Sequence, residues 1–313
     1  MAYFCMQNED IIRIYGDEFL MQTELRQALA ALGQAISPEM IATTARLLAP
    51  HAPRPQADSC TVFRDLGYGP HARHRMDVFV PTGEVRARPV LLFVHGGGFT
   101  MGQKGGPDDV FYNHIGAWAA AQGWVSATMN YRLAPDHAWP AGADDVAMAA
   151  QWLQENAHAW CGGAPAVVLM GQSAGAAHVA GCLARWPAER QPRPAAAILL
   201  SGLYDLQTLR HSERERLYYG ADAGLFAERS SLPGLLDGGW PCLYTVSELD
   251  PAEFQQQAAQ VVAASMERTG RWPEMLYLSG HNHLSSVQQL GSPQDTVGPL
   301  LAEFVRRVAS DPR

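Results

Sequence analysis

The chain carries a series of short, almost uninterrupted apolar runs, and these constrain its fold more than any other feature. Five of them have the length of a strand and lie at residues 89–94, 124–129, 166–170, 195–200 and 242–246. A strand that is apolar at every position is buried on both faces, as in a parallel sheet covered by helices. A further strand is predicted at Arg73–Val80, where alternation of polar and apolar residues indicates burial of one face only.

Amphipathic stretches, such as residues 144–157 and 251–268, separate these runs. Strand–helix alternation of this kind predicts right-handed crossovers, and therefore an α/β fold with a mostly parallel central sheet and helices on both faces. The segment from about Leu206 to Gly239 breaks the alternation, because it is mixed in charge and rich in Gly and Ser. We expect this segment to form a lid above the sheet.

The first 55 residues have a different character. Two helical patterns, at residues 8–33 and from Pro38 to about Leu48, precede a segment in which three prolines fall within six residues, Pro50 to Pro55. Ser37 followed by Pro38 is typical of a helix start, whereas the later prolines cannot continue a helix. We therefore expect a helical cap segment over residues 1–55 and one main domain over residues 56–313.

Charge and cysteine content exclude several classes of protein. With 31 acidic residues against 23 Lys and Arg, the net charge is −8, which argues against binding to nucleic acid or to an anionic membrane surface. No uncharged apolar run approaches the roughly 20 residues that span a bilayer. The N-terminus lacks the pattern of a signal peptide, and the five cysteines are scattered without a CxxC pair. We expect reduced thiols and a cytoplasmic location.

The sharpest chemical motif is Gly171-Gln-Ser173-Ala-Gly175, which lies between an apolar run and a helical pattern. A serine on such a strand-to-helix turn is held in a strained backbone conformation, and small neighbours let the chain turn without a clash. The pentapeptide alone would be a weak signal in a chain with 29 glycines, but its position at the end of a buried strand makes Ser173 a candidate nucleophile.

A second motif, His95-Gly-Gly-Gly-Phe99, directly follows the apolar run at residues 89–94. Consecutive glycines leave backbone N–H groups open to a ligand. In acyl transfer, such donors stabilise the oxyanion of the tetrahedral intermediate together with the N–H of the residue after the nucleophile. The candidate donors are Gly97, Gly98 and Ala174.

A serine nucleophile needs a base, and the base needs an acid that orients it. Two acids, Glu248 and Asp250, follow the run at residues 242–246, and two histidines, His281 and His283, follow a strand predicted at residues 273–278. Each pair falls where the carboxyl ends of parallel strands gather an active site. The residues alone leave both choices open. A metal site at His281 and His283 is not expected, because no further ligands occur at a suitable spacing.

The motifs together resemble those of the hormone-sensitive-lipase-like carboxylesterases of the α/β-hydrolase superfamily. The resemblance covers most of the chain from about Cys60 onward and rests on four motifs in order: His95–Phe99, Asn130–Asp136, Pro140–Asp145 and Gly171–Gly175. That family takes its acid from an Asp-Pro pair, which implies Asp250. Asn282-His283-Leu284 resembles the Asp-His-Phe of arylformamidases, which implies His283. The chain departs from the family pattern at Gln172 and Ala176, where Asp and Gly are usual.

The resemblance implies a serine carboxylester hydrolase for small, short-acyl esters, with a catalytic triad of Ser173, Asp250 and His283 and no cofactor or metal. An arylformamidase or amidase with the same triad is the alternative. Phe99, Tyr218 and Tyr219 are the candidates for lining the substrate pocket. The resemblance alone also suggests a homodimer.

Overall fold

The computed structural model describes residues 22–85 and 87–310, which form an eight-stranded sheet in the order β1-β2-β4-β3-β5-β6-β7-β8. All neighbouring strands from β4 to β8 are parallel, whereas β2 is antiparallel to both β1 and β4. The mostly parallel α/β fold is confirmed. The strands are β1 (Cys60–Gly67), β2 (Arg75–Pro81), β3 (Val90–Val94), β4 (Val125–Met129), β5 (Val167–Gln172), β6 (Ala196–Leu200), β7 (Cys242–Leu249) and β8 (Met275–Asn282).

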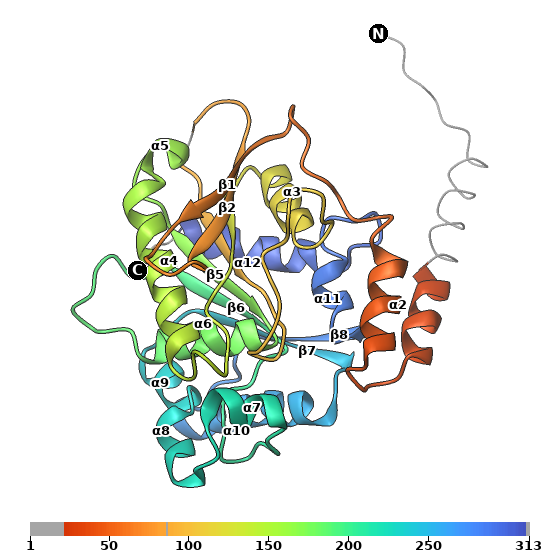
Figure 1. Cartoon of the computed structure of the whole chain (residues 1–313), viewed down its shortest axis with the longest axis vertical. Helices are drawn as coiled ribbons and strands as arrows, with labels where there is room; N and C mark the ends of the chain where they lie inside the picture. The colour runs from red at the N-terminus through yellow and green to blue at the C-terminus, as the bar shows by residue number, and fades with distance from the viewer. Residues whose placement is uncertain (1–21, 86, 311–313) are drawn as a thin grey trace.

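Helices cover both faces of the sheet (Figure 1). Alternate residues of β3 show the division, because Leu92 packs with one set of helices and Phe93 with the other. The first face carries α4 (Ala141–Asn156), α6 (Ala174–Ala184), α9 (Leu232–Asp237) and α10 (Ala252–Thr269). The opposite face carries α3 (Asn113–Ala121), α11 (Ser285–Gln288) and α12 (Gly298–Ser310). A short helix, α5 (His158–Cys161), follows α4.

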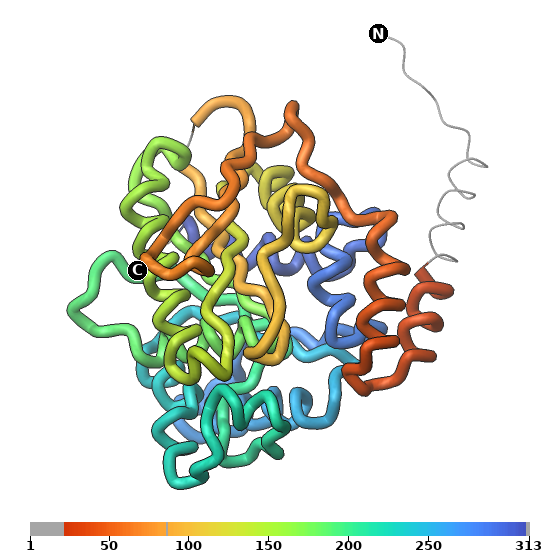
Figure 2. Tube along the Cα trace, viewed as in Figure 1, coloured from red at the N-terminus to blue at the C-terminus, as the bar shows by residue number. Residues whose placement is uncertain are grey.

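The N-terminal helices lie beside the end of β8. Residues 22–31 are helical, and α2 (Pro38–Leu48) begins where Ser37 accepts a hydrogen bond from the Met40 N–H, as its sequence predicts. Figure 2 shows this segment next to the part of the chain that carries α11. Thr44 Oγ1 in α2 accepts a hydrogen bond of 2.8 Å from Asn282 Nδ2. The predicted helix over residues 8–21 lies outside the described residues.

The segment between β6 and β7, predicted as a lid, contains α7 (Glu213–Tyr219), a 3₁₀ turn (Ala223–Leu225), α8 (Phe226–Arg229) and α9. Ser212 and Glu215 form a reciprocal capping box at the start of α7. Leu206, Leu209 and Tyr218 form an apolar cluster with Phe99 and Ala174, so the segment packs directly on the turn that follows β5.

The prediction that only one face of Arg73–Val80 is buried is wrong. Strand β2 lies inside the sheet, and Met76, Asp77, Val78 and Phe79 are all fully buried. Asp77 looks like a solvent-facing position in the sequence, but Lys104 Nζ contacts it at 2.6 Å and Arg64 Nη1 at 2.7 Å. The two cations replace the water that a carboxylate would otherwise need.

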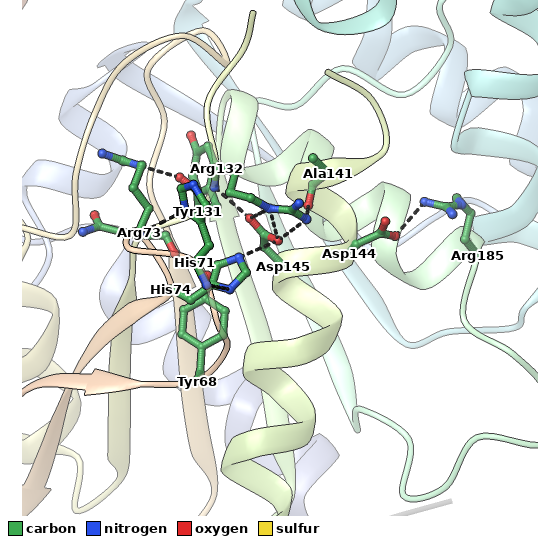
Figure 3. A network of polar contacts seen from close by, with 11 residues as sticks. Tyr68, His71, Arg73, His74, Tyr131, Arg132, Ala141, Asp144, Asp145 and Arg185 are labelled. Atoms are coloured by element: carbon green, nitrogen blue, oxygen red, sulfur yellow. Dashed lines mark hydrogen bonds and ion pairs between the residues drawn. The ribbon is translucent and has the colours of Figure 1, made fainter. Parts of the chain in front are cut away.

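His74, which directly precedes β2, is buried. Its Nε2 contacts Asp145 Oδ1 at 3.1 Å, and Asp145 also binds Arg132 (Figure 3). Arg132 Nε and Nη2 both reach the Asp145 carboxylate, and its backbone N–H donates to the same group at 2.7 Å. This network fixes the loop after β4 to helix α4.

The four cysteines within the described residues, Cys60, Cys161, Cys182 and Cys242, are free thiols. Among the described helices, none is both long enough and apolar enough to cross a membrane.

Candidate active site

Ser173 occupies the tight turn between β5 and α6. Its backbone has φ 56° and ψ −122°, outside the regions that most L-residues adopt. Gly175 makes the turn feasible, because a Cβ on that residue would lie 2.1 Å from the carbonyl oxygen of Val94. Strain of this kind persists only where the surrounding structure enforces it, and it exposes the serine hydroxyl at the carboxyl edge of the sheet.

Asp250 and His283 meet after β7 and at the end of β8. Asp250 Oδ1 lies 2.7 Å from His283 Nδ1, and both side chains are almost fully buried. The other carboxylate oxygen of Asp250 accepts hydrogen bonds of 2.7 Å from Ser201 Oγ and from the backbone N–H of Ser247. A carboxylate held by these donors fixes the imidazole with Nδ1 protonated, which leaves Nε2 free to accept a proton.

The other two candidates have different surroundings. The Glu248 carboxylate accepts hydrogen bonds from the Gly280 N–H and from Ser279 Oγ, and these bonds lower its pKa. His281 contacts Ser285 and Thr296 through its two ring nitrogens, and burial lowers its pKa to about 4. The structure therefore brings Asp250 to His283 and leaves Glu248 and His281 outside this contact.

The second ring nitrogen of His283, Nε2, is the atom that would accept the proton of a nucleophile. His283 Nε2 is buried and has no hydrogen-bond partner among the described residues, Ser173 included. The Phe254 ring packs on the imidazole with ring centroids 4.3 Å apart. Catalytic hydrogen bonds between a serine hydroxyl and an imidazole often tighten only when a substrate is bound.

The glycine loop after β3 lies against the nucleophile. A Cβ on Gly96 would be 3.3 Å from Ser173 Cβ, so the two backbones approach closely. Gly97 has φ +128°, a conformation that essentially requires glycine. Within the described residues, the N–H groups of Gly97 and Gly98 donate to no backbone acceptor. The Ala174 N–H is in the first turn of α6, where no intrahelical partner exists.

The three residues predicted to line a substrate pocket are buried and pack on one another. Phe99 stacks on Tyr218 with ring centroids 4.7 Å apart, and Tyr219 meets Phe99 edge-on at 5.3 Å. Their exposed fractions are 1%, 2% and 5%. The apolar cluster they form connects the segment between β6 and β7 to the loop that carries Gly97 and Gly98.

Two further residues that support this site were not among the candidates predicted from the sequence. Ser201 is the first residue after β6 and binds Asp250, while Gln172 donates from Nε2 to the backbone carbonyl oxygen of His283 at 2.8 Å. The position of Ser201 at the carboxyl end of a buried strand was the available signal. For Gln172, the departure from the usual Asp pointed to an unusual contact without revealing its partner.

A mostly parallel sheet with a serine on the turn after a central strand, and an imidazole–carboxylate pair at the same edge, is the arrangement of an α/β hydrolase. Residues 91–284 match a family described as having the alpha/beta hydrolase fold, and the chain belongs to that family. The α/β-hydrolase superfamily predicted from the motifs is thereby confirmed.

Two curated relatives are from Mycobacterium tuberculosis. The carboxylesterase NlhH is 42% identical over 88 residues, which are 28% of this chain and 26% of that protein. The esterase LipC is 30% identical over 166 residues, 49% of this chain and 40% of that protein. The matched parts thus span less than half the length of these relatives.

Solved structures agree in fold along nearly the whole chain. Esterase B from Lactobacillus Rhamnosis superposes with a TM-score of 0.66 at 18% identity, covering 94% of this chain and 96% of that one. An esterase from the bacterial hormone-sensitive lipase family gives a TM-score of 0.59 at 21% identity, covering 95% and 99%.

Proposed function

We propose that this chain is a serine carboxylester hydrolase that acts through Ser173, His283 and Asp250. The observation that carries the proposal is the 2.7 Å contact between His283 Nδ1 and Asp250 Oδ1. Gln172, the residue before the nucleophile, binds the backbone of His283 and so ties this pair to the turn that holds Ser173. The names of the matched relatives, a carboxylesterase and an esterase, support the same reaction class.

The reaction begins when His283 Nε2 removes the proton from Ser173 Oγ as the oxygen attacks the ester carbonyl carbon. Asp250 holds the imidazole in position and stabilises the positive charge that develops on it. The carbonyl oxygen becomes an oxyanion, which accepts hydrogen bonds from the N–H groups of Gly97, Gly98 and Ala174. Ser173 lies at the N-terminus of α6, where the helix dipole also favours negative charge.

The protonated His283 then donates its proton to the leaving alcohol as the tetrahedral intermediate collapses to an acyl-enzyme on Ser173. Water enters, His283 Nε2 removes one of its protons, and the resulting hydroxide equivalent attacks the acyl carbon. The second tetrahedral intermediate collapses with return of the proton to Ser173 Oγ and release of the acid. All steps use the same three side chains and the same three backbone donors.

The substrates we propose are small esters with short acyl chains. The lid segment over residues 206–239 packs through Tyr218 on Phe99, next to the glycine loop, and so limits the space above Ser173. The N-terminal helices, which contact Asn282 through Thr44, act as the second part of the cap. The domain over residues 56–313 is then the catalytic domain.

The proposal is tested with p-nitrophenyl esters from acetate to dodecanoate, measured on the wild-type enzyme and on Ser173→Ala. We expect kcat/KM to peak at acetate or butyrate and Ser173→Ala to reduce it by a factor of at least about 10³. Full turnover by Ser173→Ala would disprove the assignment, and a maximum at dodecanoate would disprove the short-acyl preference. N-formylkynurenine, measured in parallel, distinguishes an arylformamidase from an esterase by which substrate has the larger kcat/KM.

A further inference from the structure

One cationic side chain of the lid segment lies directly over the glycine loop. Arg214 is the second residue of α7, and a Cβ placed on Gly98 would be 2.7 Å from Arg214 Cδ and 3.1 Å from its Nη1. The three atoms nearest to that Cβ position all belong to Arg214. The Arg214 side chain therefore lies beside Gly98, the residue that supplies one of the three proposed oxyanion donors.

The rest of α7 fixes Arg214 in this place. Arg214 and Tyr218 are four residues apart and so lie on the same face of the helix. Tyr218 stacks on Phe99 at 4.7 Å with an angle of 4° between the rings, and its backbone carbonyl accepts a hydrogen bond from the Trp139 N–H. Because Phe99 directly follows Gly98, the same helix face that packs on Phe99 also presents Arg214 to Gly98.

The Arg214 guanidinium has no partner of its own within residues 22–85 and 87–310, where no hydrogen bond or ion pair involves this side chain. The nearby Glu215 carboxylate is occupied by the Ser212 N–H in the capping box. Asp250 is fully buried and already binds His283, Ser201 and Ser247. By contrast, Arg132 binds Asp145 and Arg64 binds Asp77.

We propose that Arg214 is a substrate-binding residue that selects esters carrying a carboxylate a few atoms from the scissile carbonyl. This inference rests on the proposed ester hydrolysis at Ser173 and narrows its substrate class. A guanidinium presents a planar pair of donors that matches a carboxylate. A single free guanidinium suits a monoanion better than a phosphate dianion, which proteins usually bind with several donors.

The test uses two pairs of esters that are matched in shape and differ in charge. On the acyl side, p-nitrophenyl hydrogen succinate is compared with p-nitrophenyl isocaproate. On the alcohol side, p-acetoxybenzoate is compared with p-isopropylphenyl acetate. The quantity of interest is the ratio of wild-type to variant kcat/KM for each ester, because this ratio cancels the intrinsic reactivity of the ester. The variants are Arg214→Gln, Arg214→Lys and, as a matched control, Arg216→Gln.

Arg216 is exposed, as Arg214 is, but it lies two residues further along the same helix and therefore on the opposite face. We expect Arg214→Gln to lower kcat/KM for the anionic member of at least one pair about tenfold more than for its neutral partner. Arg214→Lys is expected to recover part of this selectivity, and Arg216→Gln to leave it unchanged within about twofold. The pair that responds identifies the side of the ester that carries the carboxylate.

Equal losses for the anionic and neutral esters of both pairs in Arg214→Gln would overturn the inference. The inference also fails if Arg216→Gln changes the selectivity as much as Arg214→Gln does. These outcomes leave the proposed function intact as long as Ser173→Ala abolishes hydrolysis of the neutral esters. Failure of the proposed function has a different signature, namely turnover of all four esters that does not depend on Ser173.

Discussion

The Nε2 atom of Gln172 donates a hydrogen bond of 2.8 Å to the backbone carbonyl oxygen of His283. The residue before the proposed nucleophile thus holds the loop that carries the proposed base. The two residues are 111 positions apart in the chain, and Gln172 is almost completely buried. This side-chain amide therefore joins the loop of the imidazole directly to the turn of the serine.

Removal of that amide is expected to impair catalysis more than folding. For Gln172→Met, which keeps the length of the side chain, we predict a loss in kcat of about tenfold and a destabilisation of about 1 kcal/mol. The control is Gln154→Met, because Gln154 is also buried but neither of its amide atoms has a hydrogen-bond partner within the described residues. Steady-state kinetics and urea unfolding of both variants make the comparison. Unchanged kcat in Gln172→Met would show that the loop is positioned by other contacts.

Substitution of the two acids distinguishes them by function. Asp250→Asn keeps the shape of the side chain but removes the charge that orients His283, and we expect kcat to fall by roughly 10³–10⁴. Glu248→Gln changes a carboxylate that binds Ser279 and Gly280, and we expect its kcat to stay within about threefold of wild type. Ester hydrolysis measured side by side checks this. A larger loss in Glu248→Gln than in Asp250→Asn would reverse the assignment of the acid.

Substitution of His281 and His283 distinguishes the two histidines by function in the same way. His283→Ala is expected to abolish turnover, whereas His281→Ala is expected to lower the melting temperature and to retain most of the activity of the folded fraction. The reason is that the two ring nitrogens of His281 contact Ser285 and Thr296, whereas Asp250 contacts His283. Calorimetry and kinetics on the same samples separate the two effects. Turnover that survives in His283→Ala but not in His281→Ala would contradict the prediction.

Buried histidines are expected to make folding stability depend on pH. Burial lowers the pKa of His95 and His114 to about 4 and that of His178 to about 3. An unfolded histidine has a pKa of about 6.5, so between these values the unfolded chain binds protons that the folded chain does not. The contribution of these histidines to the free energy of unfolding is therefore fully present above about pH 6.5. It is lost as the pH decreases toward about 4, by roughly 1.4 kcal/mol per pH unit for each histidine.

His178→Leu tests this prediction, because neither ring nitrogen of His178 has a hydrogen-bond partner among the described residues. At about pH 7, we expect the variant to unfold at nearly the same urea concentration as the wild type. When the pH is lowered to about 5.5, we expect the variant to lose less stability than the wild type loses. An identical loss of stability in the two proteins would show that His178 gains no proton on unfolding.

The buried charge cluster around Asp77 of β2 is expected to stabilise the folded chain. Lys104→Met leaves the fully buried Asp77 with Arg64 as its remaining cationic partner, and we predict a destabilisation of about 3 kcal/mol. In Arg185→Gln, which breaks an exposed pair with Asp144, the loss is expected to stay below about 1 kcal/mol. Urea unfolding of the two variants gives both numbers. A smaller effect in Lys104→Met than in Arg185→Gln would contradict this account of Asp77.

Most strands of the sheet could be predicted from the sequence, because strands that are buried on both faces consist of apolar residues. The apolar runs at residues 89–94, 124–129 and 195–200 correspond to β3, β4 and β6 within one residue at either end. The prediction was incomplete for β7 and β8, which continue to Leu249 and Asn282 through polar residues. These residues are polar because they lie at the carboxyl edge, where strand pairing continues beyond the apolar core.

Contacts between segments that are distant in the chain could not be predicted from local sequence patterns. His74 is buried because of Asp145, 71 residues later in the chain, and nothing near His74 in the sequence reveals that partner. The same holds for Ser201 with Asp250 and for Arg214 with Gly98. The residue types of the site could be predicted from motifs, while the side chains that contact them from distant segments became visible only in the fold.

The central claim is that Ser173 is the nucleophile, and the most direct test is covalent labelling with a fluorophosphonate followed by intact-mass and peptide analysis. We predict that the wild-type chain gains one phosphonyl group, located on the peptide that contains Ser173, and that Ser173→Ala gains none. Equal labelling of Ser173→Ala, or a label on a different serine of the wild-type chain, would contradict the claim.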